Sequence, residues 1–73
     1  MIENLTEIIR EYTGNNDINV TENTYMIADL GLNSLDLVNL ACEVEDEFDI
    51  EIPDRAITTF KTVGDVLDFI GNS

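Results

Sequence analysis

Ser34 is the residue whose type and position could carry chemistry in this sequence. It lies in the run Asp29-Leu-Gly-Leu-Asn-Ser34-Leu-Asp36, where a long polar segment gives way to an amphipathic one. A hydroxyl at this point is expected in the first turn of a helix, open to solvent and at the positive end of the helix dipole. A phosphate ester on that oxygen would be favoured electrostatically. The same position also suits a simple N-cap, so position alone leaves both interpretations open.

The rest of the composition excludes most kinds of enzymatic catalysis. The sequence has no histidine and one cysteine, Cys42, so the residues for a zinc site or for histidine-based catalysis are missing. We therefore expect neither an enzyme nor a metal centre. A lone cysteine cannot form an internal disulfide, which fits a reducing cytoplasm.

The chain is short and strongly acidic. Its 73 residues predict a single domain spanning residues 1–73, and a chain of this size buries only roughly 60% of its unfolded surface. Three basic and sixteen acidic residues give a net charge of −13. This charge argues against nucleic acid and anionic membranes as partners and favours basic protein surfaces. No apolar run approaches the roughly 18 residues that cross a bilayer, and no signal-peptide pattern is present.

The spacing of apolar residues predicts a small all-α bundle of three main helices plus one short helix, with a long loop between the first and second helices. The first helix is expected over residues 2–13, ending at Gly14. Residues 14–33 show no clear period and form the long loop. Loops of this length in compact domains tend to be functional, and its scattered apolar residues predict that it packs over the helices.

The remaining elements follow the long loop. The second helix is expected over residues 35–48, and a short helical turn from Pro53 to about Phe60. Residues 48–52 alternate apolar and polar side chains, but a lone strand has nothing to pair with, so an extended connector is expected there. A capping box at Thr62 begins the last helix, and Gly71 closes it.

The second helix has two different faces. At about 100° per residue, one side gathers the core residues Leu37, Leu40, Ala41, Val44 and Phe48. The other side carries Leu35, Asn39, Cys42 and Asp46, flanked by Asp36, Glu43 and Glu47. Isolated apolar residues on a surface are normal, but small apolar groups within an acidic stripe are also typical of a contact surface, in which the acids steer a partner.

Carboxylates continue beyond this helix. The stretch 43–54 contains Glu43, Glu45, Asp46, Glu47, Asp49, Glu51 and Asp54. Two carboxylates about 6 Å apart repel by roughly 0.7 kcal/mol in water, so the stretch does not serve stability and partner binding is the better explanation. It lacks the ligand register and central glycine of an EF-hand loop, so no specific divalent-ion site is expected.

These motifs resemble those of acyl carrier proteins. The resemblance rests on the serine motif 29–36, on the acidic run Glu43-Val-Glu-Asp-Glu-Phe48-Asp-Ile-Glu-Ile-Pro53-Asp54, and on Phe60, Thr62-Val63 and Asp68-Phe69-Ile70. The resemblance covers most of the chain from about residue 25 to 70, and the apolar spacing of the first helix also fits the family. The sequence departs from the family at Asn33, where most members have aspartate, although an amide can still accept hydrogen bonds at a helix start.

The resemblance implies a freestanding, non-catalytic, monomeric carrier. Ser34 would accept 4′-phosphopantetheine from coenzyme A, and the thiol of that arm would carry growing acyl chains as thioesters in fatty-acid or polyketide biosynthesis. Phosphopantetheinyl transferase and acyl-chain synthase or transferase enzymes with basic patches would dock on Leu35, Asp36, Asn39, Cys42, Glu43, Asp46 and Glu47. Short acyl chains would lie between the helices, against Leu40, Val44, Phe48, Ile52, Phe60 and Leu67.

Two alternatives stay open from the sequence. One is a carrier of another kind, for aminoacyl or peptidyl groups or for cell-wall synthesis. The other is an unmodified acidic interaction module that keeps the carrier fold, which Asn33 alone favours.

Overall fold

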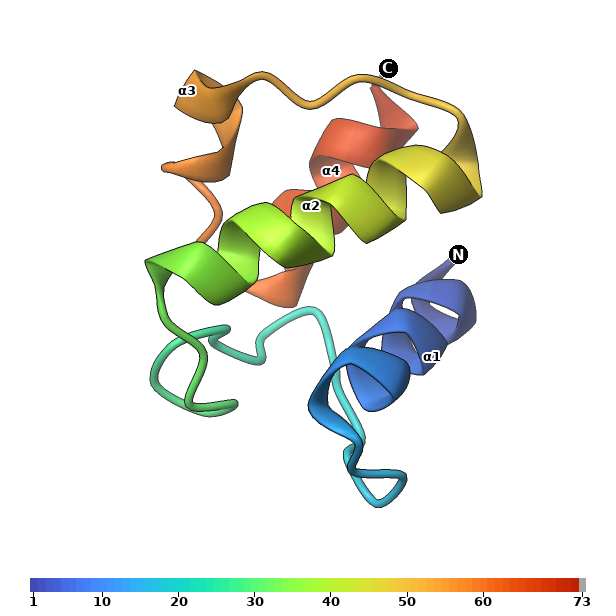
Figure 1. Ribbon diagram of the computed structural model, residues 1–73, viewed down its shortest axis with the longest axis vertical. Coiled ribbons are helices and arrows are strands. Elements are labelled where there is room, and N and C mark those ends of the chain that lie inside the picture. Colours follow the sequence, from blue (N-terminus) through green and yellow to red (C-terminus); the bar gives the residue numbers. More distant parts are fainter. Residues whose placement is uncertain (73) are drawn as a thin grey trace.

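The computed structural model describes residues 1–72, and over these residues the chain forms the expected helical bundle. The elements are α1 (Ile2–Thr13), α2 (Ser34–Phe48), α3 (Asp54–Ile57) and α4 (Val63–Gly71). Figure 1 shows α2 crossing the molecule, with α4 behind it and with α1 and the short α3 on opposite sides. The predicted fold class is confirmed, and residues 50–53 form the expected extended connector instead of a strand.

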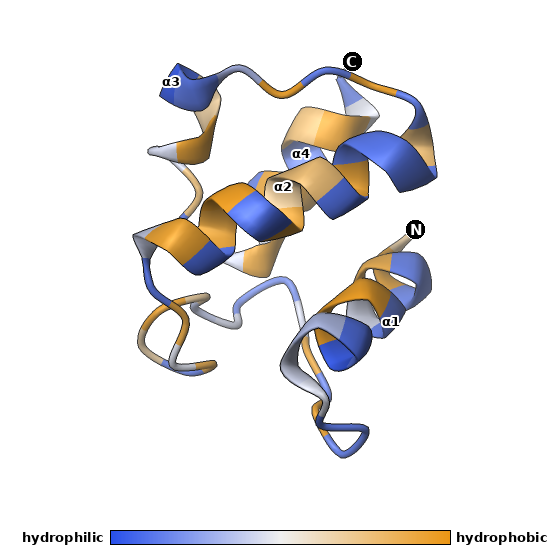
Figure 2. Cartoon of the chain, viewed as in Figure 1, coloured by the Kyte–Doolittle hydropathy of each residue, from blue (hydrophilic) through white to orange (hydrophobic). Residues whose placement is uncertain are grey.

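The core lies where α1, α2 and α4 meet. Its most deeply buried side chains are Leu5, Ile9, Val44 and Val63, each less than 2% exposed. In Figure 2, apolar and polar residues alternate along α1 and α2, as expected for helices with one face toward the core, and α4 is mostly apolar. This burial is the main source of stability in a domain of this size.

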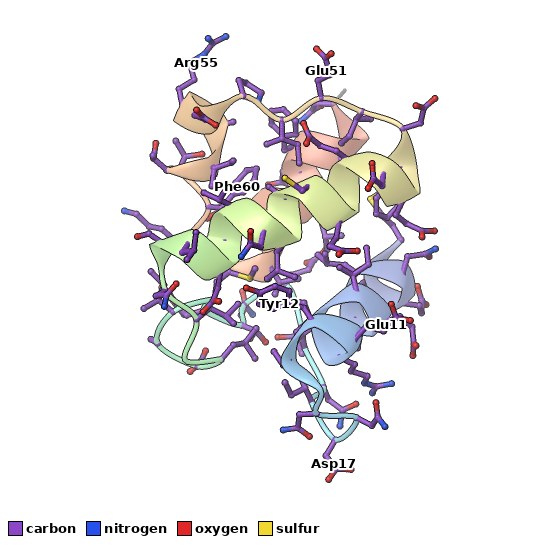
Figure 3. All side chains as sticks on the ribbon, viewed as in Figure 1. Glu11, Tyr12, Asp17, Glu51, Arg55 and Phe60 are labelled. Atoms are coloured by element: carbon purple, nitrogen blue, oxygen red, sulfur yellow. The ribbon has the colours of Figure 1, made fainter. Side chains whose placement is uncertain are left out.

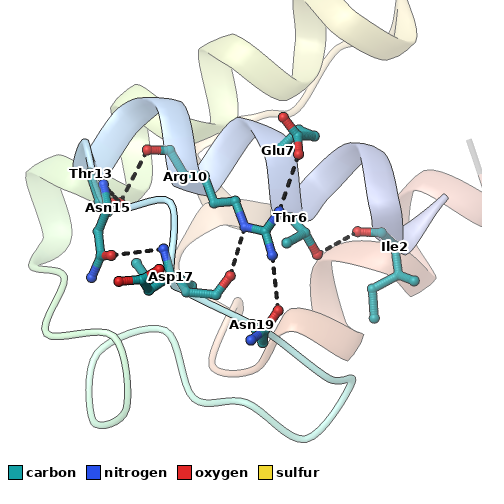
Figure 4. A network of polar contacts seen from close by, with 9 residues as sticks. Ile2, Thr6, Glu7, Arg10, Thr13, Asn15, Asp17 and Asn19 are labelled. Carbon is teal, nitrogen blue, oxygen red and sulfur yellow. Dashed lines mark hydrogen bonds and ion pairs between the residues drawn. The ribbon is translucent and has the colours of Figure 1, made fainter.

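The C-terminal end of α1 is joined to the long loop by Arg10. Its Nε donates to the Ile18 carbonyl oxygen at 2.8 Å, one Nη donates to Asn19 Oδ1 at 2.9 Å, and the other lies 3.3 Å from Glu7 Oε1 (Figure 4). The turn itself uses Gly14, which takes a left-handed backbone with φ of 73° as expected for a helix C-cap. The loop therefore leaves α1 in a fixed direction.

The long loop packs down over the helices, as predicted. Met26 is 2% exposed and Leu32 is 6% exposed. The backbone of the loop pairs with the segment before α4: Met26 N–H donates to the Lys61 carbonyl at 2.9 Å, and Val63 N–H donates to the Thr24 carbonyl at 2.9 Å. Tyr25 and Thr62 form an isolated antiparallel bridge between these hydrogen bonds. This pairing places the loop, the start of α2 and the segment before α4 next to one another.

One element is shorter than the sequence predicts. The short helix α3 ends at Ile57, and residues 58–59 continue as a turn, so the predicted end near Phe60 was wrong. The Thr58 and Thr59 hydroxyls donate to the backbone carbonyls of Arg55 and Ala56, at 2.8 and 2.7 Å. Carbonyl groups that would continue the helix are engaged by these side chains, which is how short polar residues end helices.

Candidate functional site

The first turn of α2 is set by a capping box. Asn33 Oδ1 accepts a hydrogen bond from Asp36 N–H at 2.9 Å, and Asp36 Oδ2 accepts one from Asn33 N–H at 3.0 Å. Asn33 is therefore the N-cap and Ser34 is the first helical residue, so the interpretation of Ser34 as an N-cap was wrong. The amide oxygen of Asn33 accepts the capping hydrogen bond at the helix start that an aspartate carboxylate could also accept.

Since Asn33 provides the N-cap, the Ser34 hydroxyl does not cap the helix. The residue is exposed, and its hydroxyl forms no hydrogen bond with any other residue of the described range 1–72. It lies at the positive end of the α2 dipole, where an attached anion is favoured. The hydroxyl is thus accessible and uncommitted, as a modification site requires.

Ser34 borders an apolar groove of about 530 Å³. The groove lies between the long loop, the first half of α2 and the α3 region, and its lining is Tyr25, Ile27, Ala28, Ser34, Leu37, Val38, Asp54, Ile57, Thr58, Phe60 and Lys61. Three of these apolar side chains are unusually open to solvent, with Tyr25 at 51%, Ile27 at 54% and Val38 at 41%. A long flexible chain attached to Ser34 would find apolar walls immediately beside its attachment point.

A second, closed space lies deeper in the bundle. It measures about 10 Å³ and is lined by Leu5, Met26, Leu37, Leu40, Ala41, Val44, Ile52, Phe60 and Val66. Of the residues expected against an acyl chain, Leu40, Val44, Ile52 and Phe60 are in this lining, whereas Phe48 and Leu67 are half-buried and lie outside it. Leu37 and Phe60 line both the groove and the closed space.

The groove is a feature that sequence reasoning missed. Its walls come from three stretches that are distant in sequence and meet only through the loop pairing near Lys61. The only available signal was the stretch of apolar residues around Tyr25 and Ile27 inside an otherwise polar loop, together with Val38 on the second helix.

The outer face of α2 is open to solvent, as expected for most of its residues. Leu35 is 67% exposed. The other exposed residues on this face are Asn39, Cys42, Glu43, Asp46 and Glu47. Asp36 differs because it is half-buried against α1.

Asp36 and Asn39 both contact Tyr12 of α1. The Tyr12 hydroxyl donates to Asp36 Oδ1 at 2.6 Å and accepts from Asn39 Nδ2 at 3.1 Å. Figure 3 shows Tyr12 lying between α1 and α2. The hydrogen bond from the Tyr12 hydroxyl, followed by that from the Asn33 N–H, holds the pKa of Asp36 below its ordinary value. The same contact with Asp36 raises the pKa of Tyr12. One phenol therefore links α1 to the turn that carries Ser34.

Replacing Tyr12 by phenylalanine should make stability less dependent on acid pH. The lowered pKa of Asp36 means that its contribution is present above the ordinary value of 3.8 and is lost as the pH falls through the folded-state value. We expect the melting temperature of Tyr12→Phe to lie roughly a few degrees below that of the native chain at pH 7, and the difference to shrink as the pH falls below 3.8. Tyr25→Phe is the matched control, and a constant gap from neutral to acid pH would contradict this role of Tyr12.

One acid of the 43–54 stretch has a structural role instead of an outward one. Glu45 is half-buried, and its Oε2 accepts a hydrogen bond from Ile52 N–H at 2.6 Å. This bond holds the connector after α2, where Asp49 takes a left-handed backbone with φ of 54°. Glu45 therefore stabilises the connector, in contrast to the exposed acids of the stretch.

Among residues 1–72 no three acidic or cysteine side chains gather closely enough to hold a metal ion. Within the same range, no helix combines the length and apolar character needed to cross a membrane.

Comparisons with known proteins agree with this geometry. The family model described as "Phosphopantetheine attachment site" matches residues 3–70. Acyl carrier proteins from two strains of Clostridium perfringens, SM101 and ATCC 13124, are each 43% identical over 70 residues, covering 96% of this chain and 92% of theirs. A solved structure assigned as an acyl carrier protein, from Mycobacterium tuberculosis, superposes with a TM-score of 0.88 at 38% identity, covering 96% of this chain and 93% of that one.

The bundle, the exposed serine at the start of α2 and the family match over nearly the whole length define a small helical domain for phosphopantetheine attachment. Within that class, the chain belongs to the acyl carrier protein family. It is a carrier and not a catalyst, and membership implies interaction with a phosphopantetheinyl transferase and with acyl-handling enzymes.

Proposed function

We propose that the chain carries growing acyl groups of fatty-acid or related polyketide synthesis on a phosphopantetheine arm attached to Ser34. The observation that carries this proposal is the exposed, uncommitted Ser34 hydroxyl at the edge of an apolar groove. When bound, the arm supplies a thiol that holds the acyl group as a thioester. The protein supplies the attachment point, an apolar environment for the acyl group and a surface that its partners recognise.

The interior supports an aliphatic cargo. The closed space of about 10 Å³ is lined by apolar residues, and a short acyl chain would enlarge it by displacing Leu37 and Phe60, which line both this space and the groove. Apolar cavities bind apolar groups without competing water. A charged aminoacyl group has no polar partner among the residues that line this space.

The outer face of α2 supports docking of basic partners. Leu35 and Cys42 lie among Glu43, Asp46 and Glu47, all exposed on one side of the helix that begins at Ser34. Partners that act on the arm must come close to Ser34, and an acidic face next to it would steer basic surfaces there. Asn39 and Asp36 border this face, although both are hydrogen-bonded to Tyr12.

The cargo is tested by offering the modified protein two kinds of activating enzyme. We expect a fatty-acyl ligase to load it, and an aminoacyl- or peptidyl-carrier adenylating enzyme to leave it unloaded. Intact-mass measurement reports the added group, and Ser34→Ala, which cannot receive the arm, is the matched control. Loading by the amino-acid enzyme alone would replace this proposal with the aminoacyl carrier.

A further inference from the structure

The groove beside Ser34 contains one cation. Lys61 is the only lysine of the chain, and apart from Ser34 the polar residues of the lining are Tyr25, Asp54, Thr58 and Lys61. The molecule has a net charge of −13 and only three basic side chains, and one of these three lies in the same groove lining as the candidate attachment point. Within the fold, hydrogen bonds from the Thr62 and Lys61 N–H groups hold the pKa of Asp65 below its ordinary value, and the Lys61 charge adds a smaller effect.

The backbone of Lys61 is held by two hydrogen bonds, whereas its ammonium group makes no close ion pair among the described residues. Its carbonyl accepts from Met26 N–H at 2.9 Å, and its N–H donates to Asp65 Oδ2 at 3.0 Å. The residue is exposed, and within residues 1–72 its ammonium group forms no ion pair within 4.0 Å. Arg10, by contrast, uses its guanidinium to join α1 to the loop.

An arm on Ser34 would bring a negative phosphodiester into acidic surroundings. Asp36 lies two residues further along α2, and Asp54 lies in the same groove lining. The dipole of α2 offsets part of this repulsion, and a flexible ammonium across the groove offers a direct counter-charge.

We propose that Lys61 binds the phosphodiester of the arm attached to Ser34 and holds the arm against the groove. The proposal rests on the attachment at Ser34 proposed above. It assigns Lys61 a positioning role that depends on the modification, because the unmodified chain offers its ammonium no ion-pair partner among the described residues.

Amine labelling tests this role, because the chain has a single lysine. The unmodified and phosphopantetheine-bearing proteins are treated with a limiting acylating reagent, and labelling of Lys61 is followed by peptide mass spectrometry with the Met1 amine as internal reference. We expect labelling of Lys61 to slow by roughly two- to five-fold on modification, the range that an exposed ion pair provides. The Met1 amine should react at the same rate in both forms.

Phosphorus NMR of the modified protein gives a second readout. Lys61→Gln should shift the phosphodiester resonance, while Arg55→Gln, which removes the same charge from a side chain that points away from the bundle (Figure 3), should leave it in place. Labelling at equal rates in both forms, with a resonance insensitive to Lys61→Gln, would overturn the role of Lys61 alone. Failure to obtain any modified protein would overturn the attachment at Ser34 and, with it, this inference.

Discussion

The double substitution Glu43→Lys and Asp46→Lys should weaken binding of a phosphopantetheinyl transferase by roughly 10- to 100-fold, with α2 still folded. Each reversal removes one attraction to a basic partner and adds a repulsion of similar size, and such exposed pairs contribute up to about 1 kcal/mol each. Because every 1.4 kcal/mol is about tenfold in affinity, two reversals reach this range. Both side chains are exposed, so circular dichroism should be unchanged.

A control must separate this local effect from the change in net charge. Asp17→Lys with Asp68→Lys changes the charge by the same amount, using exposed residues of the long loop and of α4. Titration calorimetry at low and moderate salt should show a large loss of affinity, and a weaker salt dependence, for the α2 variant only. Equal losses for both double variants would mean that the acidic face of α2 is not a specific docking surface.

Phe60→Ala should lower the melting temperature by more than about 10 °C. The Phe60 side chain is 7% exposed and packs edge-to-face on Phe69, with ring centroids 5.8 Å apart. Truncating a buried phenylalanine costs roughly 3–5 kcal/mol, and a domain of this size has roughly 4–11 kcal/mol in total. Much of the stability of the bundle is therefore expected to disappear with this one ring.

Phe60→Leu provides the comparison, because it keeps most of the apolar volume between the groove and the closed space. Its thermal unfolding should lie much nearer to that of the native chain. If Phe60→Ala melted at the native temperature, Phe60 would not be the packed core residue that its burial and its contact with Phe69 indicate.

The helices could be predicted from local signals because those signals are strong here. Apolar spacing gave α1 and α4 to within a residue, and Gly14 and the Thr62–Asp65 capping box mark a helix end and a helix start. The start of α2 was misplaced by one residue because asparagine and serine are both good caps and stand side by side. The spacing of Asn33 and Asp36 is that of a capping box and identifies the true cap.

Other features depend on contacts that one sequence does not reveal. Glu45 belongs to a run of outward carboxylates by sequence, and only the fold of the connector brings Ile52 N–H to it. Tyr12 fits an apolar helix stripe, so its bond to Asp36, 24 residues away in sequence, could not be foreseen. The groove depends likewise on the loop pairing with the segment at Lys61.

The most direct measurement follows the Ser34 hydroxyl itself. The native chain and Ser34→Ala are incubated with coenzyme A and a broad-specificity phosphopantetheinyl transferase, and the products are analysed by intact-mass and peptide mass spectrometry. We predict one added phosphopantetheine on the native chain, located on the peptide at Ser34, and none on the variant. An unmodified native chain, even with a cognate transferase, or the same addition to Ser34→Ala, would contradict the assignment of Ser34 as the attachment point.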